Sequence, residues 1–193
     1  MNHVVPGMCE AVVIPHSQIH EVAGEVSDFL TTHVKSARGG VALDSALYVV
    51  TVRDPLHQLV AAASVALSAD IVALSAVSGA PLPPTHVIDA LAIHPRYRRQ
   101  QTGRNLVKVI ESHPHTARQS LLVAMSFAMD HCDGFWQAIG YTLTRRAMPA
   151  VLPADVLGVA STPSFPGLSA HNTLTPARFV YRTLPPTTAS GTP

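Results

Sequence analysis

The segment from residue 85 to residue 146 alternates between two kinds of hydrophobic pattern, and this alternation restricts the chain to few folds. The runs THVIDALAI and SLLVAMSFAM are short and almost continuously apolar, which is typical of strands buried on both faces. Between them GRNLVKVIES places its apolar residues on one side of a helix. DGFWQAIG predicts a second helix closing at Gly140, and YTLTRR predicts a further strand. Strands that alternate with helices pair in parallel at least once, so we expect an α/β domain.

The first third of the chain predicts one strand, one helix and a hairpin. EAVVIP ends as a strand at Pro15, QIHEVAGEVSDFLTTHV has helical spacing, and SALYVVTVRD and HQLVAAASVAL flank a turn at Pro55. The apolar run over residues 59–77 is as long as a membrane span. Asp70 lies near its middle, where a charge costs about 3 kcal/mol. Two strands joined by a turn near Asp70 therefore explain the run better.

The C-terminal region differs from the rest of the chain in amino-acid composition. Half of the sixteen prolines lie between Pro149 and Pro193. ARFVYRTL predicts a last strand, and residues 185–193 are expected to be a disordered tail. A chain of 193 residues suits one core. We therefore expect one domain over residues 1–184, with residues 85–146 as its most characteristic part.

Composition limits the partners of the protein. The chain is 47% apolar and 13% charged, which indicates a folded protein, and its net charge of +1 argues against a nucleic-acid or membrane partner. Two cysteines without C-x-x-C spacing suggest a reducing compartment and no metal. The N-terminus lacks the pattern of a signal peptide. We expect a cytoplasmic protein.

One loop concentrates positive charge. Four arginines lie between Arg96 and Arg104, directly before the predicted helix. A turn that leads into a helix presents unpaired backbone N–H groups at the positive end of the helix dipole, and such a site can bind a diphosphate. Arginines nearby add charge-assisted hydrogen bonds. An arginine-rich loop of this kind also fits a solvated connection.

Three motifs around this loop resemble those of a known superfamily. Leu91-Ala92-Ile93-His94-Pro95 ends the strand, Arg98-Arg99-Gln100-Gln101-Thr102-Gly103 follows as the loop, and Phe135-Trp136-Gln137-Ala138-Ile139-Gly140-Tyr141 lies about forty residues later. Their order and spacing resemble the GCN5-related N-acetyltransferases (GNATs) over residues 85–146. The resemblance implies the α/β GNAT (acyl-CoA N-acyltransferase) fold: a mixed, mostly antiparallel sheet with a splayed parallel pair, flanked by helices.

The resemblance also implies a donor, acetyl-CoA, and a binding site for it. Coenzyme A would be held by one strand end, by the loop and by one aromatic residue: Leu91, Ala92, Ile93, Arg98, Arg99, Gln100, Gln101, Thr102, Gly103, Arg104 and Trp136. The sequence departs from the family pattern at two positions. Gln101 stands where the family has its first glycine, so either the loop is reshaped or its backbone keeps a negative φ. Trp136 stands where many members have a tyrosine that protonates the leaving thiolate, and an indole N–H is not a useful acid.

Proton transfer needs further residues. An alkyl amine with a pKa of about 10 must lose a proton before it attacks a thioester. Strand alternation would place Val87, Asp89, Leu91 and Ile93 on one face, and the family often has an acidic residue or a histidine here. Asp89 is therefore the candidate general base, although a neighbouring Arg or Thr could also simply pair with it. His94 is expected to be a partly exposed loop residue. The donor that replaces the missing tyrosine could be Asp130, His131 or Cys132.

These observations leave three functions open. The first is a cytoplasmic, acetyl-CoA-dependent N-acetyltransferase that acts on a primary amine of a small molecule or protein, as a monomer or homodimer. The second is a catalytically degenerate binding module of the same fold, which Gln101 and Trp136 favour. The third is a member acting on tRNA or DNA, which the net charge of +1 disfavours.

Overall fold

The computed structural model describes residues 3–5, 9–34, 40–66, 85–117, 121–127, 131–143, 150–151, 164–165 and 177–184. The main strands are β1 (His3–Val5), β2 (Cys9–Pro15), β3 (Ala46–Arg53), β4 (Leu59–Ala66), β5 (Thr85–Ile93), β6 (Leu121–Phe127), β7 (Thr142–Leu143) and β10 (Ala177–Thr183). The helices are η1 (His16–Gln18), α1 (Ile19–His33), η2 (Pro95–Tyr97), α3 (Thr102–Ser112), α4 (Pro114–Ala117) and α5 (Asp133–Ala138).

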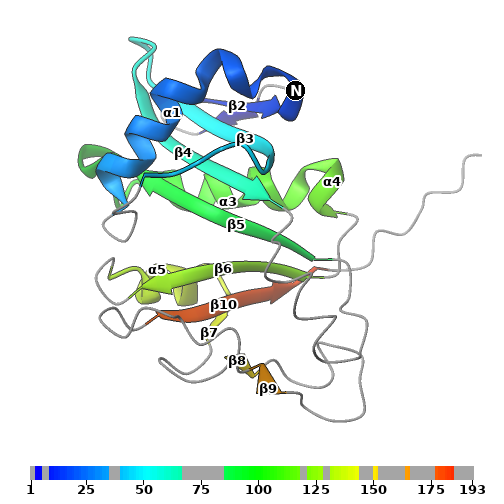
Figure 1. The fold of residues 1–193 in the computed structure, drawn as a ribbon. Coiled ribbons are helices and arrows are strands. Elements are labelled where there is room, and N and C mark those ends of the chain that lie inside the picture. Colours follow the sequence, from blue (N-terminus) through cyan, green and yellow to red (C-terminus); the bar gives the residue numbers. More distant parts are fainter. Residues whose placement is uncertain are drawn as a thin grey trace, which may run out of the picture.

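Eight of the described strands form one mixed sheet in the order β1-β2-β3-β4-β5-β6-β10-β7 (Figure 1). Every neighbouring pair is antiparallel except β5 and β6, which are parallel. A separate two-stranded pair joins β8 (Ala150–Val151) to β9 (Ser164–Phe165). The mixed, mostly antiparallel sheet predicted from the sequence is confirmed.

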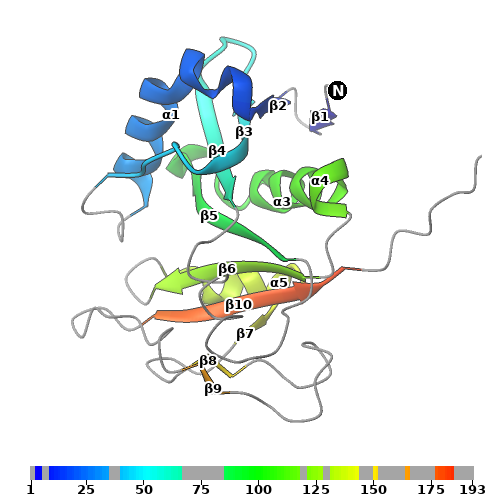
Figure 2. The same cartoon turned by 45° about the vertical axis from the view of Figure 1, so that its right-hand side comes forward.

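Two helices cover opposite faces of the first half of the sheet (Figure 2). On one face α1 contributes buried residues to a cluster with β3, β4 and β5: Ile19, Val26, Leu30, Val49, Ala62, Ala90 and Ala92. On the other face α3 packs into a larger cluster that includes Leu106, Val107, Ile110, Val50, Ala63 and Ile88. Each helix thus buries the apolar stripe that its sequence spacing predicts, and the sheet is apolar on both sides.

The parallel strands β5 and β6 pair only where they begin. Their register runs from Thr85 beside Leu121 to Ile88 beside Ala124 and then stops. Beyond that point β5 continues to Ile93 along β4, while β6 continues along β10. The two strands diverge toward their C-terminal ends (Figure 1). The splayed parallel pair is therefore confirmed, and within the described residues it leaves one edge of β5 without a neighbouring strand over residues 89–93.

A β-bulge lies where the strands separate. Ser64 of β4 pairs with Ala90, and the next residue, Val65, pairs with Ile88. Asp89 is therefore an extra residue without a partner in this ladder. A bulge inserts one residue and re-aims the side chains around it.

The bulge changes which residues of β5 share a face. Ile88 packs in the same cluster as Leu91 and Ile93, whereas Ala90 and Ala92 pack under α1. Strict alternation would separate Ile88 from the other two, so the alternation shifts by one residue across the bulge. Regular spacing predicted that Val87, Asp89, Leu91 and Ile93 all lie on one face of the strand. This prediction is wrong, because the bulge interrupts the regular spacing.

The predicted elements agree with the structure where it describes them. The structure contains the predicted strand that ends at Pro15, which is β2, and the helix that follows it. It also contains the hairpin at Pro55 and the predicted elements from residue 85 onward. The strand predicted as YTLTRR is recorded for Thr142–Leu143. The predicted turn near Asp70 and the predicted tail lie outside the described residues. Among the described helices, none has the length and apolarity needed to cross a bilayer.

Candidate functional site

The loop between β5 and α3 has an unusual backbone. Arg99 has φ 61° and Gln101 has φ 64°, both in the left-handed region that favours glycine. Gln101 occupies the N-cap position of α3, and its side chain makes no capping hydrogen bond. The alternative in which Gln101 keeps a negative φ is therefore wrong: the loop retains the conformation that a glycine would adopt, at the energetic cost of a side chain there.

The N-terminus of α3 follows directly after the basic loop, as the sequence predicts. The first main-chain hydrogen bond at this end runs from Asn105 N–H to Gln101 O, at 2.9 Å. The N–H groups of Thr102, Gly103 and Arg104 precede it, in the first turn of the helix, where N–H groups lack intrahelical acceptors. They lie at the positive end of the helix dipole. An anion could bind here.

Two of the four arginines are held by backbone carbonyls. Arg98 Nε donates to Ile93 O at 3.1 Å, and Arg104 Nη2 donates to Ala138 O at 3.0 Å. The first bond joins the loop to the end of β5, and the second joins α3 to the end of α5. Both guanidinium groups are exposed yet restrained, so their charges stay close to the helix N-terminus.

The other two arginines have no such restraint. The side chains of Arg96 and Arg99 are exposed, and neither forms a hydrogen bond within the described part of the chain. Gln100 Nε2 donates to the carbonyl oxygen of Arg96 at 2.7 Å, which tightens the turn. The loop and the first turn of α3 therefore combine two restrained guanidinium groups with two that have no hydrogen bond within the described residues.

The backbone N–H and C=O groups of β5 point alternately toward β4 and toward the open edge of the strand. His94 N–H donates to Val60 O of β4 at 2.8 Å. Because successive residues of a strand direct their N–H and C=O groups to opposite sides, Ala92 directs its groups to β4, and Ile93 and Leu91 direct theirs to the splayed side. Of the three predicted backbone contacts, Leu91 and Ile93 have the orientation that a ligand between the strands would require.

Gly103 and Trp136 have packing roles. A Cβ on Gly103 would lie 2.5 Å from Ile93 Cδ1 and 2.9 Å from Phe135 Cε2, so a glycine is needed for the close contact of α3 with β5 and α5. Trp136 is 3% exposed, and its ring meets that of Phe135 edge-on and that of Tyr141 at a tilt, each at a centroid distance of 5.0 Å. Its predicted contact with a cofactor stays a prediction.

Asp89 differs from the rest of its strand. Its side chain is exposed, whereas Ile88 and Ala90 are buried. Desolvation by the surrounding protein raises the pKa of the Asp89 carboxyl. No Arg or Thr of the described residues bonds to it, so the alternative of a structurally paired carboxylate finds no support there. A carboxylate that is accessible, unpaired in this part of the chain and raised in pKa is suited to accept a proton.

The candidate proton donors are only partly described. Asp130 lies outside the described residues. His131 is exposed with φ 51°, and Cys132 is half-buried against the core that includes Trp136. Neither contacts Asp89 in the hydrogen bonds of the described residues. The identity of the donor stays a prediction.

His94 is half-buried, as expected for a partly exposed loop residue, and its ring makes edge-on contacts with two other rings. Its ring lies 5.4 Å from that of His33 and 6.0 Å from that of Tyr97, and its Nδ1 accepts a hydrogen bond from Arg96 N–H. Burial, followed by the charges of His94 and Arg98, lowers the pKa of His33. Within the described residues, no three His, Cys, Asp or Glu side chains are arranged to hold a metal ion.

A hydrogen-bonded chain that the sequence did not indicate joins the loop to the hairpin of β3 and β4. Asp54 is buried in the hairpin turn, where its Oδ1 accepts N–H bonds from Leu56 at 2.9 Å and Gln58 at 3.0 Å. Its Oδ2 accepts a bond from the Tyr97 hydroxyl at 2.9 Å. Tyr97 O in turn accepts a bond from Thr102 Oγ1 at 3.0 Å. The turn is thus linked to the first residue of α3.

The pKa shifts of Asp54 and Tyr97 indicate which of the two groups carries the charge in their hydrogen bond. Desolvation acts to raise the pKa of Asp54, but hydrogen bonds from Gln58, Tyr97 and Leu56 outweigh it, and the pKa is lowered overall. The bond to Asp54 raises the pKa of Tyr97, followed by desolvation. Asp54 is therefore an ionised acceptor at neutral pH, and Tyr97 is a phenol that donates to it.

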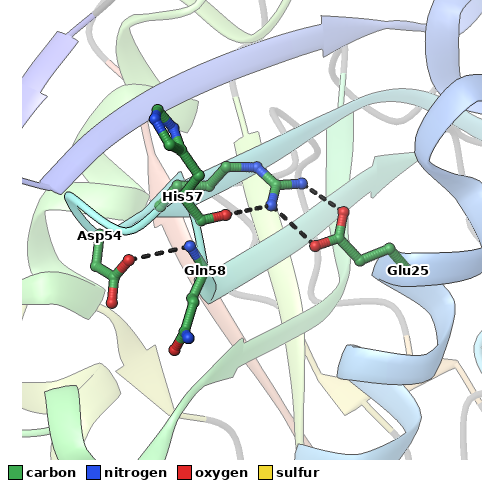
Figure 3. A network of polar contacts seen from close by, with 5 residues as sticks. Glu25, Asp54, His57 and Gln58 are labelled. Atoms are coloured by element: carbon green, nitrogen blue, oxygen red, sulfur yellow. Dashed lines mark hydrogen bonds and ion pairs between the residues drawn. The ribbon is translucent and has the colours of Figure 1, made fainter.

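The hairpin turn is itself fixed to α1 (Figure 3). Arg53 Nη1 donates to Glu25 Oε1 and to the carbonyl oxygen of His57, each at 2.8 Å, and Arg53 Nη2 bonds to Glu25 Oε2. The hydrogen bond of Arg53 is the largest cause of the lowered pKa of Glu25. The only sequence signal for this site was the dipeptide Arg53-Asp54 before Pro55, which is too common to indicate more than a turn.

Comparison with known proteins identifies the fold. No family model and no curated protein matches the sequence. Among solved structures, polyamine N-acetyltransferase of Drosophila melanogaster is 15% identical, with a TM-score of 0.56 over 90% of this chain and 100% of that one. Ribosomal-protein-S18-alanine N-acetyltransferase of Escherichia coli is 11% identical, with a TM-score of 0.53 over 96% and 99%. A GNAT acetyltransferase of Elizabethkingia anophelis with bound acetyl-CoA is 11% identical, with a TM-score of 0.53 over 90% and 98%. The chain has the GNAT fold.

Proposed function

We propose that this chain, which has the GNAT fold, is an N-acetyltransferase that transfers an acetyl group from acetyl-CoA to a primary amine of a small molecule or protein. The observation that carries the proposal is the open edge of β5. It begins at an accessible carboxylate, Asp89, and ends at a basic loop that opens a helix. A long ligand with an anionic end and a reactive end suits such an edge, and acetyl-CoA is one.

The donor would lie along this edge in an extended form. Its diphosphate would bind the N–H groups of the first turn of α3, with Arg98 and Arg104 beside it. The amides of its pantetheine arm would pair with the backbone groups of Leu91 and with the Ile93 N–H, as an added strand would, since Ile93 O already accepts a bond from Arg98. The acetyl group would then lie toward Asp89, where the two strands meet.

Asp89 would accept a proton from the protonated amine, directly or through one water. The amine nitrogen then forms a bond to the acetyl carbon, and the carbon–sulfur bond breaks. The Leu91 N–H would stabilise negative charge on the carbonyl oxygen as this happens. The second amine proton leaves the nitrogen, and the thiolate takes up one proton to give the free thiol, so the protons balance.

Donor binding is tested by thermal unfolding with acetyl-CoA. A ligand at a hundred times its Kd stabilises the folded state by about 2.7 kcal/mol. For a chain of this size that corresponds to a Tm increase of roughly 5–10 °C. Absence of any shift at millimolar acetyl-CoA would contradict the proposal.

Catalysis is tested by thiol release from acetyl-CoA in the presence of an amine and peptide library. Once an acceptor is found, Asp89→Asn should lower turnover about a hundredfold and leave the thermal shift unchanged, because it removes the base without changing the donor site. Asp44→Asn is the matched control, since Asp44 is an exposed carboxylate in the turn before β3. Unchanged turnover in Asp89→Asn would remove Asp89 as the base.

The same assays distinguish the alternative functions. A thermal shift with no acceptor in the library would favour the binding module, for which the deeply buried Trp136 at the usual acid position is the supporting observation. Retention on immobilised RNA at physiological salt would favour a nucleic-acid substrate.

A further inference from the structure

The basic loop has bonds within its own turn, but few of its side chains are packed. Arg96, Arg98, Arg99, Gln100 and Gln101 all have exposed side chains, so little of the loop is packed. Arg99 and Gln101 both have left-handed backbone conformations. Conformations of this kind persist in non-glycine residues only where the surrounding structure imposes them. Contacts outside the loop therefore contribute to fixing it.

One such contact joins Tyr97 to Asp54. Tyr97 is half-buried in the middle of the loop, and its hydroxyl donates to the buried Asp54 carboxylate at 2.9 Å across 43 residues of sequence. Its carbonyl oxygen receives the Thr102 hydroxyl, so a displacement of Tyr97 would also displace the first residue of α3. Tyr97 thus connects a fixed acceptor on one side with the helix N-terminus on the other.

Asp54 is a firm anchor. Two backbone N–H groups of its own turn hold the carboxylate, and the preceding residue, Arg53, is paired with Glu25 of α1. The turn joins β3 and β4, which lie in the interior of the sheet. A charge held in this way does not have to be ordered when a ligand binds, which favours affinity.

We propose that Asp54 and Tyr97 are positioning residues that pre-organise the loop and the first turn of α3 for a diphosphate. The inference rests on the proposed function, which supplies the diphosphate ligand. Neither residue has to touch the ligand. Both act through the placement of the N–H groups of residues 102–104 and of the guanidinium groups beside them.

The test uses the full chain and three probes measured by calorimetry. Acetyl-CoA contains both a diphosphate and a pantetheine arm, 3′-phosphoadenosine 5′-diphosphate contains only the diphosphate part, and S-acetylpantetheine contains only the arm. Tyr97→Phe should raise the Kd for the first two about tenfold, because a hydrogen bond to a charged group is lost and the loop must be ordered on binding. The Kd for S-acetylpantetheine, titrated at millimolar concentration, should stay within about twofold of the wild-type value.

Two further variants separate positioning from general stability. Asp54→Asn should also raise the Kd for acetyl-CoA and for 3′-phosphoadenosine 5′-diphosphate. The double variant with Tyr97→Phe should have Kd values no higher than those of the more affected single variant, because both changes break the same interaction. Tyr141→Phe is the matched control: it removes a phenol that donates to Glu111 Oε1 at 3.2 Å, away from the loop. It should lower Tm without changing any of the three Kd values.

The outcomes distinguish this inference from the proposed function. Equal diphosphate binding by the wild type and Tyr97→Phe, or equal weakening of S-acetylpantetheine, would overturn the inference and leave the acetyltransferase proposal standing. Diphosphate binding that depends on Tyr97 without any acetyl transfer would uphold the inference and overturn the acetyltransferase proposal. A wild-type chain that binds neither diphosphate probe would overturn both.

Discussion

His86 should make the protein markedly less stable in mild acid. It is 3% exposed, at the start of β5, and its Nδ1 lies 3.2 Å from Thr116 Oγ1. The Thr116 hydroxyl also bonds to the hydroxyl of Tyr48, whose ring contacts that of His113 at a tilt, with a centroid distance of 4.1 Å. Burial, followed by the charges of His115 and His113, lowers the pKa of His86 to about 4. The folded protein therefore holds this histidine neutral.

The sign and size of the effect follow from linkage. The ordinary pKa of a histidine is about 6.5, so between that value and about 4 the unfolded chain binds a proton that the folded chain does not. The stability that His86 contributes is complete above the ordinary pKa and is lost as the pH falls through the folded-state pKa. Linkage gives a loss of about 2 kcal/mol between pH 7 and pH 5, and about 3 kcal/mol below pH 4. Either loss is a large part of the stability of a typical domain.

Urea unfolding followed by the fluorescence of Trp136 measures this loss. The wild type should lose about 2 kcal/mol more between pH 7 and pH 5 than His86→Asn does, because asparagine can contact Thr116 but does not titrate. The variant should be less stable at pH 7, since the smaller side chain leaves a void, so the comparison is between pH dependences. His20→Asn, at an exposed position of α1, should retain the wild-type pH dependence. Equal pH dependence in the wild type and His86→Asn would refute the reasoning.

Two further substitutions test backbone strain and an unpaired hydroxyl. Gln101→Gly should raise the stability by about 0.5–1 kcal/mol, since the relief of left-handed backbone strain outweighs the extra conformational entropy that glycine loses on folding; a lower Tm would show that the glutamine side chain stabilises the loop. Ser64→Ala should leave the stability unchanged or raise it by about 1 kcal/mol, because the Ser64 hydroxyl is buried and has no partner among the described residues. A loss of more than about 1 kcal/mol on urea unfolding would indicate that this hydroxyl is hydrogen-bonded after all.

Much of the fold could be predicted from local patterns. Apolar runs without polar interruption gave β5 and β6, and helical spacing gave α1 and α3, because each element buries the residues that its own period brings together. The arginine loop was also predictable, since four arginines and a glycine before a helix are a local feature. The left-handed backbone of Gln101 was not, because a glutamine gives no sign of it and only neighbouring contacts impose it.

The sequence alone determined the order of the elements and the charge of the loop, since both depend on residues that are close together in the chain. Only the tertiary structure decided where the chemistry can take place. The separation of β5 from β6 and the bulge at Asp89 depend on the pairing of each strand with a different neighbour, which no single strand encodes. The bond from Tyr97 to Asp54 and the surroundings of His86 join residues that are distant in sequence, and the energies of such contacts arise only when packing brings the groups together and removes water from them.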